Sequence, residues 1–165
     1  MSARPPRREL RVKIADHAVG SGHDAITTVG LGSCVAIALH DAEARVGGLA
    51  HILLPCPALS RPGSSPAKFA ETAVPLLLRE MASIGAGPRV TAKVVGGASM
   101  FVTLLPSDGV SMGQRNVEAT LRALADAGIP VVGQDTGGEH GRSVTLDVHS
   151  GDVSVRSLKV GSRVL

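Results

Sequence analysis

The chain has 165 residues, of which 44% are hydrophobic and 19% charged, a composition typical of one globular domain and not of a disordered chain. Its formal net charge is +3, but it has no Trp, no Tyr and only two Phe, so it lacks the aromatic surface on which exposed bases stack, and we exclude nucleic acid as a partner. Two cysteines are too few for a disulfide scaffold and indicate free thiols. No apolar run suits a signal peptide or a membrane span, so we expect a cytoplasmic protein without membrane insertion.

The start of the chain is basic and proline-rich, with three arginines and two prolines within residues 4–8. Such a segment has few apolar side chains to bury, so we expect residues 1–8 to form a flexible basic tail. The remaining residues, 9–165, show no internal repeat and no linker-like boundary. We therefore expect them to form a single domain.

Patterns of apolar and β-branched residues predict that much of the chain forms short strands. Residues 15–24 are rich in glycine and predict a connection, and the Pro/Gly/Ser-rich stretch 55–66 predicts a loop. The predicted strands span residues 9–14, 25–29, 35–40, 46–53, 89–95, 131–135, 143–147 and 153–158.

Two segments carry apolar residues at helical spacing. The first spans 68–81 and contains Pro75, which predicts a kink or a local restart. The second spans 116–127 and is followed by Gly128, a typical C-terminal stop. Runs of strands interrupted by two helices predict an α+β or layered α/β single domain with mixed β-sheets.

The predicted strands at 35–40 and 46–53 are joined by a short polar turn and favour a hairpin. A turn centred between residues 42 and 43 places Cys34 directly opposite His51, with Cβ atoms about 5 Å apart. The opposite face carries larger apolar side chains that can pack on a core. Small residues on the cysteine face predict a shallow groove there: Ala36, Ala38 and Gly47.

This pairing suits nucleophilic catalysis. A free thiol has a pKa of about 8.5, which a neighbouring imidazolium lowers, so we expect Cys34 to be the nucleophile and His51 its base. The glycine turn before the cysteine favours free N–H groups at Ser33 and Cys34 as an oxyanion hole, and Gly32 lets a substrate carbonyl approach the main chain. On spacing alone, a small buried hydrophobic residue stays an alternative for Cys34. The histidines show no metal-ligand spacing, so we expect no metal site.

Several motifs resemble one known family. They cover nearly the whole chain in order and comprise residues 28–35 (TVGLGSCV), 46–51 (VGGLAH), 54–55 (LP), 68–69 (KF), 96–101 (GGASMF), 113–116 (GQRN) and 135–142 (DTGGEHGR). Together they resemble the signature of the CheD family, the chemoreceptor glutamine deamidases.

The resemblance implies a layered α/β/β fold with catalytic roles for Cys34, His51 and Thr28. It implies deamidation of glutamines to glutamate on methyl-accepting chemotaxis receptors, through a Cys34 thioester and with release of ammonia. It implies no cofactor, and some members of the family also bind the CheC phosphatase.

Alternatives stay open at this point. The chain can be a non-catalytic adaptor that binds chemotaxis proteins such as the CheC phosphatase, or an amidohydrolase acting on a small molecule. The glycine pair Gly96–Gly97 can shape a substrate groove or form a tight turn. Arg115 and Arg142 can meet an acidic receptor surface or form structural ion pairs.

Overall fold

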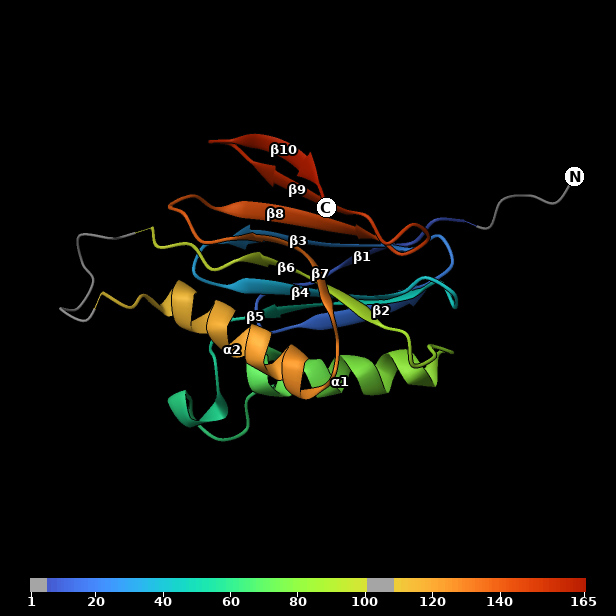
Figure 1. The fold of residues 1–165 in the computed structure, drawn as a ribbon, viewed down its shortest axis with the longest axis horizontal. Coiled ribbons are helices and arrows are strands. Elements are labelled where there is room, and N and C mark those ends of the chain that lie inside the picture. Colours follow the sequence, from blue (N-terminus) through green and yellow to red (C-terminus); the bar gives the residue numbers. More distant parts are fainter. Residues whose placement is uncertain (1–5, 101–108) are drawn as a thin grey trace, which may run out of the picture.

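The computed structural model describes residues 6–100 and 109–165, which form two stacked five-stranded sheets with two α-helices on the outer side of one of them (Figure 1). One sheet has the strand order β1-β3-β8-β9-β10 and the other the order β2-β5-β4-β6-β7. The pairs β1–β3 and β6–β7 are parallel and the other pairs antiparallel. This α/β/β layering with mixed sheets confirms the predicted fold class.

The strands are β1 (Glu9–Arg11), β2 (His17–Ser21), β3 (Ala25–Leu31), β4 (Val35–Asp41), β5 (Val46–Ile52), β6 (Thr91–Gly96), β7 (Val131–Thr136), β8 (Arg142–Asp147), β9 (Val153–Ser157) and β10 (Gly161–Val164). The helices are α1 (Ala70–Ser83) and α2 (Met112–Asp126), with short 3-10 turns η1 (Pro57–Leu59) and η2 (Pro66–Lys68). Among the described residues, no helix is long and apolar enough to cross a membrane.

The core has two layers, and β4 and β5 contribute to both because all their residues are buried. Val35, Ile37 and Leu39 point towards α1 and α2 in one layer. Cys34, Ala36 and Ala38 belong to the other layer, where they pack between the two sheets against residues of β3 and β8. The predicted shallow groove over the small residues is therefore wrong, because the second sheet covers that face. Small side chains there let the two sheets approach each other.

The predicted hairpin exists, but its register differs from the prediction. Ala36, and not Cys34, pairs with His51, and the last pair before the turn is Asp41 with Val46. The turn is centred one residue later than predicted because the Asp41 carboxylate accepts hydrogen bonds from the N–H groups of Glu43 and Ala44, each at 3.0 Å. Since the shift moves each pairing by two residues, every side chain keeps its predicted face.

Two edge strands have no counterpart among the predicted strands. β2 lies in the glycine-rich stretch predicted as a connection, where Gly20 packs closely against Asp24, since a Cβ there would lie 2.8 Å from Asp24 Oδ2. β10 pairs with β9 and has four exposed residues, so it shows no alternation of apolar and polar positions. α2 begins at Met112, earlier than predicted, because the Ser111 hydroxyl caps it by accepting the N–H of Gln114 at 3.0 Å.

The helix predicted at residues 68–81 is observed as α1, displaced by two residues. It continues through Pro75 as one helix, so the predicted restart at this position is wrong. Its buried face, which includes Val74, Leu77 and Met81, packs on the outer side of β5.

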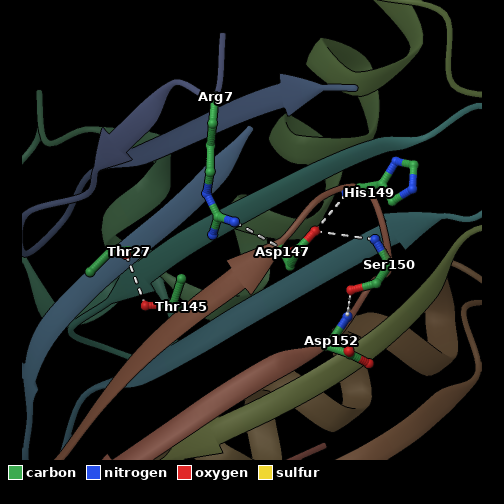
Figure 2. Close-up of polar contacts among 7 residues, drawn as sticks. All are labelled: Arg7, Thr27, Thr145, Asp147, His149, Ser150 and Asp152. Carbon is green, nitrogen blue, oxygen red and sulfur yellow. Dashed lines mark hydrogen bonds and ion pairs between the residues drawn. The ribbon is translucent and has the colours of Figure 1, made fainter. Parts of the chain in front are cut away.

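Polar contacts tie the start of the described chain to the sheet of β3 and β8. Asp147, at the end of β8, accepts the N–H groups of His149 and Ser150 and forms an ion pair with Arg7 at 3.7 Å (Figure 2). The next residue, Arg8, donates two hydrogen bonds to the Asp24 carboxylate, at 3.0 and 2.6 Å. The division into a tail of residues 1–8 and a domain of residues 9–165 stays a prediction, and residues 1–5 lie outside the described part of the chain.

Candidate functional site

Cys34 is the last residue before β4 and follows the turn that leaves β3. It is 6% exposed. Its carbonyl accepts a hydrogen bond from the N–H of Gly97 at 2.8 Å. Gly96 has φ +114, and a Cβ there would lie 2.3 Å from the same carbonyl oxygen, so the end of β6 approaches Cys34 closely only because this position is glycine.

Gly97 has a comparable role towards α2. A Cβ at Gly97 would lie 2.3 Å from Val117 Cγ2 and 2.8 Å from the carbonyl oxygen of Gly113. The two glycines expected in the site therefore contact the backbone of Cys34 and the first turns of α2. These contacts are those of a close-packed turn, and a role for the pair in shaping a substrate groove stays a prediction.

His51 lies in β5 with none of its surface exposed, and it shares the between-sheet face with Cys34. Because Ala36 is the direct partner of His51, Cys34 is its diagonal neighbour. Diagonal neighbours on one face have Cα atoms about 7–8 Å apart and are within reach of long or aromatic side chains. The structure therefore brings the predicted nucleophile and base to one face, although not directly opposite each other.

Thr28 reaches His51 from the other sheet, and its contacts determine the protonation of the imidazole. Thr28 Oγ1 lies 2.7 Å from His51 Nδ1 and 2.7 Å from the carbonyl oxygen of Val12. A carbonyl only accepts, so the single hydroxyl hydrogen of Thr28 points to Val12. Nδ1 must then carry a hydrogen and donate it to Thr28. The neutral imidazole consequently has a lone pair at Nε2, an atom that is buried and forms no hydrogen bond among the described residues.

Burial shifts the pKa values of both groups. Desolvation lowers the pKa of His51 from 6.5 to about 4, and desolvation raises the pKa of the Cys34 thiol, opposed by a weaker contact with its own backbone N–H. Both shifts act against the imidazolium that the sequence predicted beside the thiol. They favour a thiol and a neutral imidazole at neutral pH, which is the arrangement for general-base activation of the thiol.

The turn before Cys34 offers backbone donors. The N–H groups of Ser33 and Cys34 form no hydrogen bond to another described residue, as an oxyanion hole requires. Gly32 fits tightly against the Met100 side chain, whose sulfur would lie 3.1 Å from a Cβ at that position.

Sequence reasoning missed two groups of the site and left the roles of Arg115 and Arg142 open. The Val12 carbonyl carries no sequence signal, because any residue supplies one. Asn116, in the GQRN motif, donates to the carbonyl oxygens of Ser33 and Leu53 at 2.9 and 3.0 Å. Arg142 forms a buried ion pair with Asp135 at 3.0 Å. Of the two roles left open for this arginine, the structure therefore shows the structural ion pair. Among the described residues, no group of three or more His, Cys, Asp or Glu side chains is placed to hold a metal.

Cys34 and His51 share the face between the two sheets of an α/β/β sandwich, and Thr28 contacts His51 from the other sheet, as the sequence predicted for a cysteine hydrolase. The family model described as CheD chemotactic sensory transduction matches residues 53–157. A protein of Pyrococcus abyssi called probable chemoreceptor glutamine deamidase CheD is 45% identical over 96% of this chain and 96% of its own length. A Geobacter metallireducens protein, probable chemoreceptor glutamine deamidase CheD 2, is 45% identical over 91% of this chain and 94% of its own. The chain belongs to the CheD family.

A solved structure from Neisseria meningitidis, of the family described as DUF152, is similar only remotely. Its TM-score is 0.45 at 14% identity, over 81% of this chain and 64% of the other.

Proposed function

We propose that this chain is a protein-glutamine deamidase that converts glutamine side chains of methyl-accepting chemotaxis receptors to glutamate. The observation that supports this most directly is the Thr28–His51 hydrogen bond at 2.7 Å, which leaves a lone pair on Nε2 on the face shared with Cys34. The relatives named chemoreceptor glutamine deamidase supply the substrate class.

In the first half of the reaction, His51 Nε2 takes the proton of the Cys34 thiol while the sulfur attacks the side-chain amide carbon of glutamine. The amide oxygen becomes an oxyanion, held by the N–H groups of Cys34 and Ser33. The protonated imidazole then gives its proton to the amide nitrogen, the C–N bond breaks and ammonia leaves. A thioester on Cys34 remains.

In the second half, the neutral imidazole takes a proton from water, and the resulting hydroxide attacks the thioester carbonyl. The C–S bond breaks, and the thiolate takes the proton back from His51. The released glutamic acid side chain then loses its own proton to ammonia or solvent, which gives glutamate. Thr28 accepts the Nδ1 hydrogen throughout and so keeps Nε2 as the atom that exchanges protons.

Access to the site favours a slender substrate group. Cys34 is 6% exposed and His51 not at all, so only a narrow extended side chain can reach the sulfur without rearranging the sheets. A glutamine side chain projecting from a protein surface has this shape. Because the second sheet covers the face of the small residues, the preference for a protein substrate depends on this narrow access and on the relatives.

We also propose a cytoplasmic location, since both cysteines, Cys34 and Cys56, are free thiols and fit a reducing compartment. Binding to a CheC phosphatase stays a prediction from the family.

The decisive experiment is mass spectrometry of receptor cytoplasmic fragments incubated with wild-type protein or with Cys34→Ala. Each deamidated glutamine gains about one mass unit, because a carboxylate replaces an amide. We expect gains with wild type and none with the variant. Absence of any gain with folded wild-type protein and cognate receptors would favour the non-catalytic adaptor.

A further inference from the structure

Asn116 lies in the second turn of α2 and is fully buried, with none of its surface exposed. Its side-chain nitrogen donates to two backbone carbonyls, that of Ser33 at 2.9 Å and that of Leu53 at 3.0 Å. The two acceptors come from different segments. One precedes the nucleophile and the other follows the strand of His51.

The Asn116 side-chain amide replaces the hydrogen bonds between β4 and β5 at the open end of the hairpin. The last pair of the β4–β5 ladder is Val35 with Ile52, so the next residues outwards, Cys34 and Leu53, have no ladder pairing. The Asn116 nitrogen lies between the carbonyls of this open end and donates one hydrogen to each. A helix outside the two sheets thereby holds the segments of the nucleophile and the base together.

The hydrogen bond to Ser33 has a consequence for the next atom of the chain. The Ser33 carbonyl and the Cys34 N–H belong to one planar trans peptide unit, in which the two bonds point in opposite directions. Fixing the carbonyl on Asn116 therefore fixes the direction of the Cys34 N–H. The Gly97 N–H holds the following peptide through the Cys34 carbonyl at 2.8 Å, so both peptide planes beside the nucleophile are held.

The Cys34 N–H held in this way donates to no other described residue, and it belongs to the same residue as the thiol. That is the position from which an N–H can reach an oxyanion formed on an atom bonded to the sulfur.

We propose that Asn116 is a positioning residue that presets the Cys34 N–H as an oxyanion donor. This inference rests on the proposed deamidase function. Asn116 touches neither the substrate nor the thiol, and it acts by keeping one peptide plane in orientation before the substrate arrives. Its own oxygen, Oδ1, has no partner among the described residues, so the two donated hydrogen bonds are the contacts that its amide makes.

α2 also supplies a matched control. Thr120 lies one turn after Asn116, is equally buried, and has a hydroxyl without a partner among the described residues. Removing this hydroxyl as Thr120→Val perturbs the same helix face and keeps the volume, but breaks no contact with the turn before Cys34.

The experiment uses the full chain in a Cys56→Ser background and compares Asn116→Ala, Asn116→Ser and Thr120→Val with the parent. Two rates are measured well below each melting temperature: deamidation of a receptor fragment, resolved into kcat and KM, and alkylation of Cys34 by iodoacetamide across pH. Alkylation needs the thiolate but forms no oxyanion, so it separates donor positioning from general damage to the site.

We expect Asn116→Ala to lower kcat about 100-fold, the scale of a misplaced catalytic group, while KM and the alkylation profile stay within about threefold of the parent. Asn116→Ser keeps one hydroxyl hydrogen that can be donated to one of the two carbonyls. Its kcat should therefore lie between that of Asn116→Ala and that of the parent. Thr120→Val should match the parent in all three quantities.

Equal kcat for Asn116→Ala and the parent would overturn the inference and leave the deamidase function intact. So would a parallel fall in kcat and alkylation, or failure of both Asn116 variants to fold, because Asn116 would then be only a structural support. A parent protein that deamidates no receptor fragment would overturn the proposed function, and the inference with it.

Discussion

Thr28 and His51 lie on different sheets, and their hydrogen bond of 2.7 Å joins the two sheets at the centre of the site. The same hydroxyl donates to the Val12 carbonyl at 2.7 Å. The threonine therefore acts only as an acceptor towards the imidazole, and one tautomer follows. Through Thr28, the Val12 carbonyl thus keeps Nε2 of the neutral imidazole free of hydrogen, as the proposed role of His51 as a base requires.

Replacing Thr28 with valine or with serine separates the effect of its hydroxyl group from the effect of its side-chain volume. In Thr28→Val, the buried Nδ1–H of His51 loses its acceptor, which costs about 1–3 kcal/mol of unfolding free energy. The imidazole can then adopt the other tautomer or rotate, and we expect kcat for deamidation to fall about 10–100-fold. Thr28→Ser keeps the hydroxyl and should stay within a few-fold of wild type. Equal activity of Thr28→Val and Thr28→Ser would show that the hydroxyl does not orient the base.

The stability of the fold should depend on pH through His51. Its pKa is about 4 in the folded protein against 6.5 for an unperturbed histidine, so the unfolded chain binds the extra proton in this interval. Stability is therefore fully present above about pH 6.5 and is lost as the pH falls towards 4. The loss amounts to about 3 kcal/mol at pH 4.

Urea unfolding at several pH values measures this loss. The pKa values of the Asp24 and Asp41 carboxyls are lowered in the folded protein, so protonation of these groups also reduces stability. This happens only below about pH 3.9, the pKa of an unfolded aspartate. A loss of stability between pH 4 and 6.5 therefore reflects the protonation of histidine. NMR titration of the His51 ring provides the direct check. A midpoint near 6.5 would contradict the buried neutral state.

The two layers of the fold follow from local patterns, because large and small side chains alternate in residues 35–40 and residues 46–52 are mostly apolar, as in buried strands. The register of that hairpin does not follow, because it depends on the Asp41 carboxylate accepting two turn N–H groups. The edge strands β2 and β10 escape sequence reasoning because exposed backbone pairing needs no apolar pattern.

For the site, spacing within one hairpin is enough to place Cys34 and His51 on one face. Contacts between segments far apart in the chain are not readable from spacing. Thr28 came from the family resemblance, which places it beside the histidine, but the Val12 carbonyl that accepts its hydroxyl hydrogen is seen only in the structure. Asn116 stood in a recognised motif, but its role depends on α2 approaching the end of the hairpin, and no local pattern reports that approach.

The reactivity of Cys34 should rise with pH well beyond neutrality. Burial raises the pKa of its thiol, and the pKa of His51 is lowered to about 4, so the imidazole supplies no positive charge to stabilise the thiolate at neutral pH. In a Cys56→Ser background, we expect the rate of alkylation by iodoacetamide to increase about tenfold per pH unit from 7 to 9. The Cys34→Ser protein, with Cys56 as its thiol, provides the comparison. A plateau below pH 7 would mean that the resting state is a thiolate–imidazolium pair.

The close approach of β6 to the nucleophile gives a prediction for Gly96. A Cβ at this position would lie 2.3 Å from the Cys34 carbonyl oxygen, a backbone atom that cannot move aside, and the φ of +114 is itself strained for alanine. We expect Gly96→Ala to lower the unfolding free energy by about 3 kcal/mol or more and to abolish most deamidation, because relief of the clash displaces Cys34.

Gly128→Ala is the matched control, since Gly128 also has a positive φ, +71, but nothing lies within 4 Å of a Cβ there. We expect Gly128→Ala to lower the unfolding free energy by about 1 kcal/mol, because alanine is strained at a positive φ, and to leave the activity of the folded protein unchanged. Thermal unfolding together with ammonia release from receptor fragments measures both variants. If Gly96→Ala proves as mild as Gly128→Ala, β6 does not constrain the nucleophile, and the peptide planes beside Cys34 depend on Asn116 and Gly97 alone.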